Sequence, residues 1–251
     1  MRSLALIPLL ALLGCTAAVK EELNAVEEQL DGLRAELAQC QTENDRLQVK
    51  VADLERDLAN YQMADAAGLD ATQELWARID TSMGDLLCNL FPARAPATVS
   101  NFVQLAEGTK LWKDPTTGIQ GTKRLYPGTI FHRVVPEFMI QGGDPLGDGT
   151  GKVGYVLEDE FHPDLRHGAG TLAMARGADG HSGSQFFITE VATPHLDDVH
   201  NVFGKCEPLA LIKDIARVPK RPPSQAGEEP VRPVDDVVIE AITIHRGSKP
   251  R

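Results

Sequence analysis

The fold of this chain is decided by Phe131-His132-Arg133-Val134-Val135-Pro136-Glu137-Phe138-Met139-Ile140-Gln141-Gly142-Gly143-Asp144. Runs of aromatic and branched side chains stand on both sides of a turn, which is typical of paired β-strands. Because successive side chains of a strand point to opposite faces, we expect Phe131 and Ile140 in a buried core, together with Phe186 of a later run. The residues expected on the opposite face combine one arginine with large apolar side chains: Arg133, Met139, Gln141 and Phe187.

Similar short runs continue in both directions between Gly, Pro and Asp turns. The predicted strands lie at 75–81, 86–91, 129–133, 138–142, 170–175, 185–189, 202–205 and 237–245. Pro96 and Gly108 bracket a predicted helix at 97–107, and a short helix is predicted at 209–215. Many short strands with few helices predict a mainly β domain, either a closed antiparallel barrel or a sandwich.

Length and charge narrow the function classes. The 251 residues allow one large domain, or a medium one with appendages. The chain carries 36 acidic against 25 basic residues and has no cluster of Lys and Arg. Nucleic-acid binding normally requires a positive surface of that kind, so we expect neither DNA nor RNA as a partner.

The N-terminal residues 1–15 have the pattern of an export signal. An apolar run follows Arg2 and is too short to cross a bilayer, but it suits the core of a signal peptide. It ends in Leu12-Leu13-Gly14-Cys15, which resembles the bacterial lipobox. We therefore predict a lipoprotein lipidated on Cys15, with an ordinary secretory signal as the alternative. Thr16, in place of the Asp that retains such proteins at the inner membrane, favours the periplasmic face of the outer membrane.

Apolar residues between Val19 and Tyr61 recur in alternating steps of four and three. This heptad repeat predicts a coiled coil over 19–62, followed by a hinge at 63–74. The a positions hold Leu23, Leu30, Leu37, Asn44, Val51 and Leu58, and the d positions hold Val19, Val26, Leu33, Cys40, Leu47, Leu54 and Tyr61.

Two polar positions in this seam indicate how the helix associates. Asn44 at an a position can pair with its own copy, which favours a parallel homodimer. Cys40 at a d position would face its copy and could form an interchain disulfide. The alternative is one amphipathic helix folded back on the globular domain, although such a helix usually carries a wider apolar stripe.

Common catalytic templates fit the remaining chain poorly. Gly147-Asp148-Gly149-Thr150-Gly151-Lys152 looks like a phosphate loop, but Val153 stands where Ser or Thr must bind magnesium. Gly180-His181-Ser182-Gly183 lacks the second glycine of a nucleophile elbow, because Ser184 occupies that position. The histidines lack zinc-ligand spacing. We expect no metal and no cofactor.

Several segments together resemble the signature of the cyclophilins. They match in order and spacing, and the resemblance covers about residues 75–246. The matching segments are Ala97-Thr98-Val99-Ser100-Asn101-Phe102, Phe131 to Val135, Phe138 to Asp144, Leu172-Ala173-Met174-Ala175, Gly183-Ser184-Gln185-Phe186-Phe187-Ile188 and Val202-Phe203-Gly204-Lys205. The resemblance implies a closed antiparallel eight-stranded barrel with two capping helices at 75–251, and peptidyl-prolyl cis/trans isomerase activity.

The resemblance also implies a role for each matching residue. Arg133 matches the catalytic arginine, Phe138 lies in the wall of the proline pocket, and Gln141 matches the glutamine that orients the arginine. The implied substrate-binding residues are Met139, Ala175, Arg176, Gln185, Phe187, His195, Leu196 and His200. His195 departs from the tryptophan that many eukaryotic members carry. His132 and His181 are expected to be structural or to face solvent.

The expected function is therefore rotation about X–Pro bonds of proline-containing polypeptides, assisting the folding of exported or envelope proteins. An envelope-tethered module that binds one Pro-containing partner, with incidental turnover, is the alternative. A third interpretation gives the function to the coiled coil, with the globular domain as cargo. Cys88 and Cys206 lie in predicted core strands, and we favour buried free thiols over a disulfide within the domain.

Overall fold

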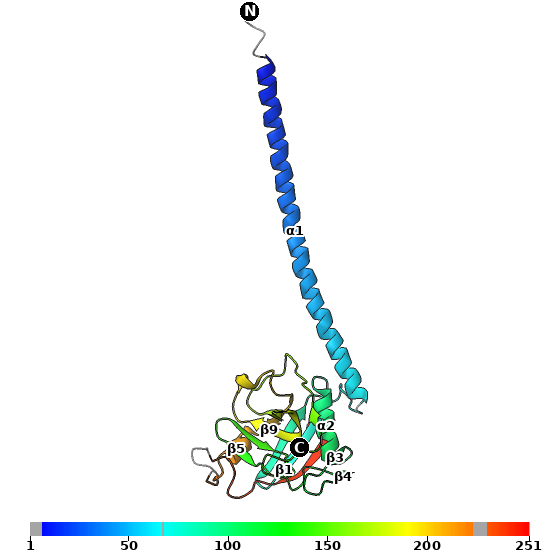
Figure 1. Ribbon diagram of the computed structural model, residues 1–251, viewed down its shortest axis with the longest axis vertical. Coiled ribbons are helices and arrows are strands. Elements are labelled where there is room, and N and C mark those ends of the chain that lie inside the picture. The colour runs from blue at the N-terminus through cyan, green and yellow to red at the C-terminus, as the bar shows by residue number, and fades with distance from the viewer. Residues whose placement is uncertain (1–6, 67, 223–229, 251) are drawn as a thin grey trace, which may run out of the picture. The chain divides into compact units, whose positions relative to one another are not determined.

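The computed structural model describes residues 7–66, 68–222 and 230–250 of the chain (Figure 1). The chain divides into two compact units, one ending at Arg56 and the other beginning at Asp57. Residues 1–6 of the predicted signal peptide lie outside the described residues, and so does the side chain of Cys15. The predicted lipidation site therefore stays a prediction.

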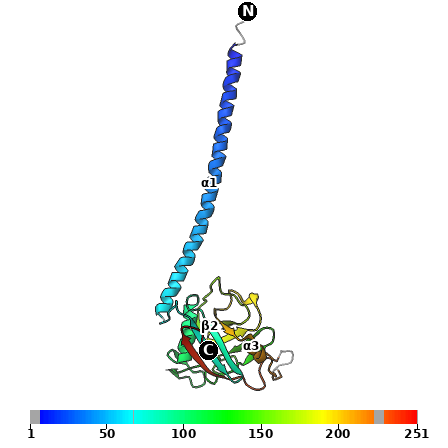
Figure 2. The same ribbon diagram turned by 180° about the vertical axis from the view of Figure 1, so that it is seen from behind.

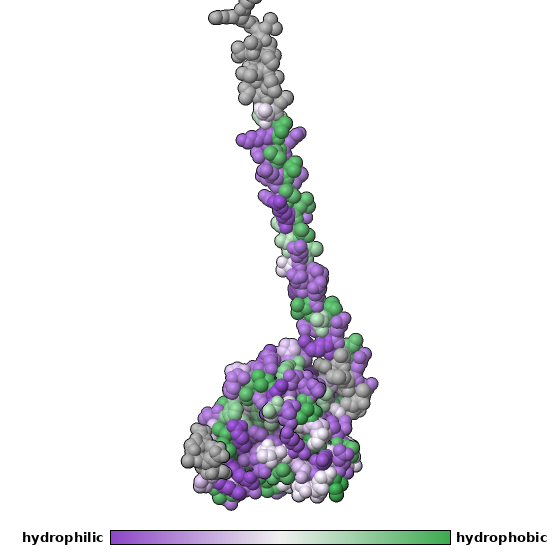
Figure 3. Space-filling model, in the orientation of Figure 1, coloured by the Kyte–Doolittle hydropathy of each residue, from purple (hydrophilic) through white to green (hydrophobic). Residues whose placement is uncertain are grey.

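The N-terminal unit consists of the long helix α1 (Ile7–Ala66), which continues into the second unit. Its apolar a and d side chains between Val19 and Leu58 are exposed, Val19 at 63% and Leu58 at 59%. Figure 3 shows hydrophobic residues recurring between hydrophilic ones along the helix. Ion pairs one turn apart, such as Arg34 with Asp31 and Arg56 with Asp53, support the exposed faces by only a few tenths of a kcal/mol each. No helix in the described ranges has the length and apolar character needed to span a membrane.

The second unit is a mainly β domain around one curled antiparallel sheet. The main path runs β11-β1-β2-β10-β8-β9-β6-β5, and β7 pairs with β9 beside it. The strands are β1 (Leu75–Thr81), β2 (Gly84–Leu90), β5 (Arg133–Val135), β6 (Met139–Gly142), β7 (Val156–Leu157), β8 (Thr171–Gly177), β9 (Gly180–Thr189), β10 (Val202–Glu207) and β11 (Ile239–Arg246).

The expectation of a closed barrel is corrected by the path of this sheet, which is open between β5 and β11. The residues before β5 approach β11 without forming a ladder: Phe131 N–H donates to the Val237 carbonyl at 2.9 Å, and Ile239 N–H donates to that of Thr129 at 2.8 Å. Ile130 bridges both Asp144 and Val238. These isolated bonds and bridges do not extend into a continuous ladder, so the sheet stays open between β5 and β11.

Two helices predicted from the sequence flank the sheet. In α2 (Pro96–Glu107), proline stands in the first turn, and Gly108 ends the helix in the left-handed conformation at φ 78°. It packs on β9 and β11, whereas α3 (Leu209–Ala216) packs on β5, β6 and β10 (Figure 2). The segment between Gly108 and Gly128 contains the hairpin β3 (Leu111–Lys113) and β4 (Gln120–Thr122), which buries Trp112.

The core is built by strand register. Val134 of β5 lies opposite Ile140 of β6, which lies opposite Ile188 of β9, which lies opposite Leu172 of β8. All of these side chains are fully buried, as are the predicted core residues Phe131 and Phe186. Phe131 and Arg133 would share a face in a regular strand. Phe131 reaches the core because the chain at 131–132 lies outside any regular strand.

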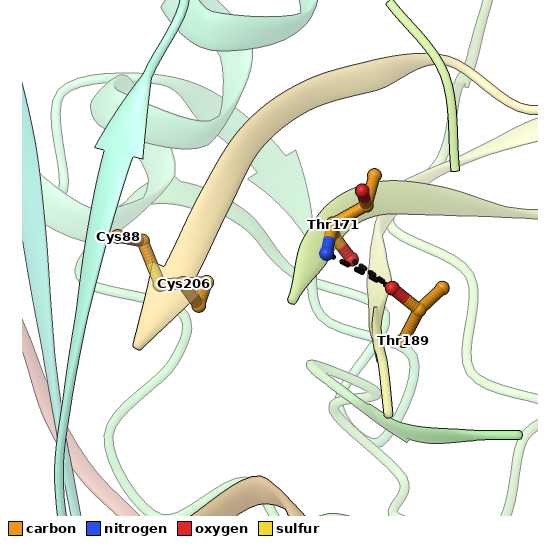
Figure 4. The surroundings of a disulfide bond; sticks show 4 residues. All are labelled: Cys88, Thr171, Thr189 and Cys206. Atoms are coloured by element: carbon orange, nitrogen blue, oxygen red, sulfur yellow. Dashed lines mark hydrogen bonds between the residues drawn. A yellow bond between two sulfur atoms is a disulfide. The ribbon is translucent and has the colours of Figure 1, made fainter. Parts of the chain in front are cut away.

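A disulfide joins Cys88 of β2 to Cys206 of β10, so the favoured interpretation of buried free thiols is wrong (Figure 4). The two cysteines lie directly opposite each other in the ladder between these strands, although 118 residues separate them in sequence. Their pairing depends on the contact between β2 and β10. The sequence shows that both positions are buried, but it does not show which strands are neighbours.

Candidate active site

The candidate site is a row of side chains on the face opposite the core. Arg133, the first residue of β5, lies directly across from Gln141 of β6, which lies across from Phe187 of β9. Residues directly opposite in an antiparallel ladder share a face, with Cβ atoms about 4.5–5.5 Å apart. The register that buries Val134, Ile140 and Ile188 therefore brings the cation, the amide and the aromatic ring together.

These side chains line a cavity of about 240 Å³. Most of the residues assigned to the site from the sequence meet there: Arg133, Phe138, Met139, Gln141, Ala175, Arg176, Phe187, Leu196 and His200. Leu196 comes from the short 3-10 helix η1 (Pro194–Leu196), which follows β9. His200 closes one side, with its ring edge-on to Phe187 at 5.1 Å and Nδ1 3.0 Å from the Met174 carbonyl oxygen.

Arg133 is held in an apolar setting. Its guanidinium lies over the Phe138 ring at 5.8 Å, and Nη1 contacts the Met139 sulfur at 3.8 Å. Within the described part of the chain, no carboxylate forms an ion pair with it. Burial lowers the pKa of Arg133 from its ordinary value. A guanidinium nonetheless keeps its proton at neutral pH, so the cavity contains a fixed cation with free donor capacity.

The glutamine of the row contacts a different partner from the expected one. Gln141 Nε2 donates to Gln185 Oε1 at 3.1 Å, and Gln185 Nε2 donates to the carbonyls of Gly149 and Gly151 at 3.2 and 3.1 Å. The structure shows no hydrogen bond from Gln141 to Arg133 among the described residues. Gln141 is therefore oriented by Gln185 and by the 149–151 loop, and it leaves the guanidinium free.

His195 lies at the rim of the cavity. Its exposed ring stacks on Phe138 with centroids 5.9 Å apart and planes at 21°, so it supports the outer face of the pocket wall. Two other histidines lie deeper. His167, buried and bonded through Nδ1 to Asp197 at 2.8 Å, stacks parallel to Phe187, and His181 is buried beside His200. Burial lowers the pKa of His167, His181 and His200, which favours neutral rings behind the pocket.

The family comparison agrees with this geometry. Residues 76–244 match the family model described as cyclophilin type peptidyl-prolyl cis-trans isomerase/CLD. The chain belongs to the cyclophilin family. It is 46% identical over 176 residues to peptidyl-prolyl cis-trans isomerase B of Streptomyces anulatus, covering 68% of this chain and 97% of that protein. It is 44% identical over 169 residues to peptidyl-prolyl cis-trans isomerase A of Mycobacterium tuberculosis, covering 67% and 91%.

Solved structures match the same part of the chain. A cyclophilin type peptidyl-prolyl cis-trans isomerase of Cryptosporidium parvum superposes with a TM-score of 0.56 at 32% identity, covering 70% of this chain and 99% of that one. A second structure of it, obtained in the presence of the dipeptide Ala-Pro, gives a TM-score of 0.55, also at 32% identity, with 68% and 98% covered. The protein is thus a cyclophilin-type peptidyl-prolyl cis-trans isomerase.

A larger groove of about 740 Å³ continues from the cavity of this cyclophilin domain. The groove and the cavity share the lining residues Gln141, Ala175 and Arg176. Gln185 lines the groove but not the cavity. Arg176 pairs with Asp159 at 2.6 Å, which fixes its guanidinium at the junction. Sequence reasoning assigned these residues but missed the opposite wall, formed by Tyr155 and the 149–154 loop.

That wall is held by contacts distant in sequence. Tyr155 donates to Asn101 Oδ1 of α2 at 2.8 Å, and Asn101 Nδ2 donates to the Gly183 carbonyl at 2.8 Å. A Cβ on Gly183 would lie 2.5 Å from Val153 and 2.7 Å from Tyr155, so only glycine allows β9 to approach this loop. Asp144 secures the start of the loop by accepting the backbone N–H groups of Leu146, Asp148 and Gly151. The one local signal was the Gly- and Asp-rich composition of the loop.

Proposed function

We propose that Arg133 catalyses X–Pro rotation by stabilising the twisted amide, and that the pocket around it binds the proline ring. Rotation of a peptide bond faces a barrier of about 18–20 kcal/mol, because the C–N bond has partial double-bond character. A twisted amide places a lone pair on the prolyl nitrogen, which a guanidinium donor can bind. The planar ground state offers no such lone pair, so this interaction lowers the barrier selectively.

The observation that supports this role is a charged guanidinium with no carboxylate partner among the described residues, beside a cavity of about 240 Å³. Phe138, Met139 and Phe187 supply apolar surface for a pyrrolidine ring, and Gln141 faces the same cavity with its amide fixed by Gln185. The Cryptosporidium relative was crystallised in the presence of Ala-Pro, which agrees with a proline-containing peptide as the ligand class. Ala175, Arg176 and Gln185 would contact the residues that precede proline.

Replacing the arginine tests the mechanism directly. Arg133→Ala should lower kcat/KM by about 10²–10³-fold, the typical loss when one transition-state donor is removed. Arg133→Lys should recover only part of it, because an ammonium on a flexible stem does not reproduce the planar donor. Exchange NMR on a short X–Pro peptide measures the rate, and thermal unfolding checks the fold. Wild-type turnover in Arg133→Ala would refute the assignment.

We further infer that the enzyme acts in a bacterial cell envelope, held by a lipid on Cys15 and paired through residues 19–62. The supporting observations are the lipobox-like Leu12-Leu13-Gly14-Cys15 and the exposed apolar stripe of α1. Its substrates would be exported polypeptides during folding. The periplasmic face of the outer membrane is the proposed location.

Fractionation and mass spectrometry test the anchor. The mature wild-type protein should sediment with membranes and carry a lipidated N-terminal Cys15. Cys15→Ser should be soluble in the periplasm, or remain unprocessed, whereas Cys40→Ser should behave like the wild type. A mature N-terminus elsewhere, with no lipid, would support the ordinary secretory signal instead.

A further inference from the structure

The turn between β5 and β6 has an unusual residue at its third position. Phe138 N–H donates to the Val135 carbonyl at 3.2 Å, which closes a turn over Pro136 and Glu137. Glu137 has a φ of +56°, in the left-handed region. Glycine is the usual residue at a turn position of this kind, because a Cβ makes that conformation unfavourable. Something outside the turn must therefore hold Glu137.

Glu190, the residue after β9, forms two hydrogen bonds with the turn, one on each side of the peptide that joins Glu137 to Phe138. Its carboxylate oxygen Oε2 accepts the Glu137 backbone N–H at 3.0 Å. Its own N–H donates to the Phe138 carbonyl at 2.8 Å. The Glu190 side chain is 0% exposed. The end of β9 thus fixes the entry to Glu137 and the exit from Phe138.

Arg217, directly after α3, supplies the counter-charge. Its Nη1 lies 2.7 Å from Glu190 Oε1, close enough for an ion pair although the atoms are not aligned as a directed hydrogen bond. Its Nη2 contacts the carboxylate of Glu137. A buried carboxylate is costly unless it is paired and hydrogen-bonded. Arg217 meets that need and binds the side chain of the strained residue at the same time.

The turn held in this way carries the wall of the proposed proline pocket. Phe138 follows Glu137 directly, and its ring contacts both the Arg133 guanidinium, 5.8 Å from the ring centroid, and the stacked ring of His195. If Glu137 left the left-handed region, the peptide before Phe138 would rotate and the ring would shift. Arg133 would then lose the surface over which its guanidinium lies.

We propose that Glu190 is a positioning residue for the isomerase, and that with Arg217 it holds Glu137 in its left-handed conformation so that Phe138 and Arg133 keep their places. The inference rests on the site assigned above. It adds two residues to those that maintain the active site: Glu190, which follows β9, and Arg217, which follows α3. Neither of them lines the cavity.

The test asks whether activity depends on Glu190 because Glu190 maintains the left-handed conformation of Glu137. Glu190→Ala should lower kcat/KM on the order of tenfold, which is less than the roughly 10²-fold that a misplacement of about 1 Å at a reacting centre can cost. Glycine adopts positive φ without strain, so Glu137→Gly alone should keep near-wild-type activity. The double variant Glu137→Gly/Glu190→Ala should recover activity to within about threefold of Glu137→Gly, since its turn no longer needs the carboxylate. Exchange NMR on the full chain measures all of them.

Thermal unfolding separates positioning from general stability. Arg217 loses its buried partner in both Glu190→Ala proteins, so both should melt below the wild type, yet only the single variant should be slow. Equal activity losses from Glu190→Ala in the two backgrounds would overturn the proposal, and so would wild-type activity in Glu190→Ala. If Glu190→Ala does not fold, Glu190→Gln, which keeps an acceptor oxygen but no charge, should show a smaller loss that Glu137→Gly again removes.

A matched arginine serves as the control. Arg217 and Arg221 have side chains 44% and 45% exposed, and both form ion pairs with carboxylates, but Arg221 pairs with Asp236 instead of Glu190 and Glu137. Arg217→Gln should slow turnover, and Arg221→Gln should not. Arg133→Ala is measured in parallel. If that variant keeps wild-type turnover, the site assignment fails, whereas a slow Arg133→Ala with an unaffected Glu190→Ala refutes only the positioning role.

Discussion

At the scale of single residues, the site depends on charge placed where water is scarce. Arg133 contributes a cation without a carboxylate partner in the described part of the chain, and burial lowers its pKa without removing its charge at neutral pH. The histidines behind it are favoured as neutral rings. A neutral ring can pack against Phe187 at little cost, whereas a protonated ring would have to keep its charge in a buried setting.

The buried histidines should make the free energy of unfolding depend on pH. Burial is the main cause that lowers the pKa of His132, His167 and His181 below the ordinary 6.5. In the unfolded chain these rings bind protons once the pH falls below about 6.5, while in the folded chain they bind them only at lower pH. Stability should therefore be full above that pH and decrease as the pH falls below it, by at most about 1.4 kcal/mol per pH unit for each ring.

Urea unfolding at pH 7.5, 6.0 and 5.0 measures this dependence. His132→Leu is the informative variant, because both ring nitrogens of His132 are buried without a hydrogen-bond partner among the described residues. It should reduce the loss of stability between pH 7.5 and 5.0. A pH dependence identical to that of the wild type would show that His132 does not contribute.

At the scale of elements, α1 and the sheet obtain their stability in different ways. Along β1 buried side chains alternate with partly exposed ones, whereas the apolar a and d side chains of α1 from Val19 to Leu58 are exposed. Helices in proteins obtain most of their stability from packing of an apolar face, so we propose that the exposed leucines at heptad spacing pack against a second helix. Asn44 at an a position favours a parallel pair.

Paired substitutions test association of the helix. Leu47 lies at a d position and Val49 two residues later at an outward f position, and both are exposed on the single helix, at 51% and 64%. Leu47→Asp should convert a dimer of the mature chain to a monomer, because it places two carboxylates in the seam. Val49→Asp should leave the dimer intact. Analytical ultracentrifugation distinguishes these results, and a monomeric wild-type protein would contradict the coiled coil.

The link between β2 and β10 predicts a further effect on stability. The disulfide of Cys88 and Cys206 closes a loop of 118 residues, and cross-links over such lengths typically contribute about 2–5 kcal/mol. The variant Cys88→Ala/Cys206→Ala should lose that amount in denaturant unfolding at pH 7. Thiol labelling of the unfolded, unreduced wild-type protein should leave both cysteines unmodified, and modification of either would rule out the bond.

At the scale of the whole molecule, the residues of the candidate site all lie in the unit that begins at Asp57. The core of that unit includes Leu69, and the Gly247 N–H bonds to the Glu74 carbonyl. We therefore expect a fragment of residues 68–251 to fold and to isomerise an X–Pro peptide with kcat/KM within about threefold of the full chain. A folded but inactive fragment would mean that α1 contributes to catalysis.

The sequence by itself determined what local pattern can specify. Alternation separated Ile140 in the core from Gln141 at the site, although it did not account for the burial of Phe131. Heptad spacing identified the helical segment, and Pro96 with Gly108 set the ends of α2. The motifs around Arg133 and Phe187 were enough to name the family and most of the cavity. These features depend on residues near one another in the chain, or on several segments in fixed order.

Only the tertiary structure decided which distant residues meet. The Cys88–Cys206 bond, the Gln141–Gln185 contact and the hold of Glu190 and Arg217 on Glu137 each need a particular strand neighbour or helix end. The gap between β5 and β11 is likewise a tertiary feature, because among the described residues only isolated bridges at Ile130 join the neighbouring stretches of chain there. No short-range pattern specifies such pairings, because strand order and register follow from packing of the whole core. The apolar run around Arg133 therefore predicted a site, and its cross-strand neighbours determine how that site is held.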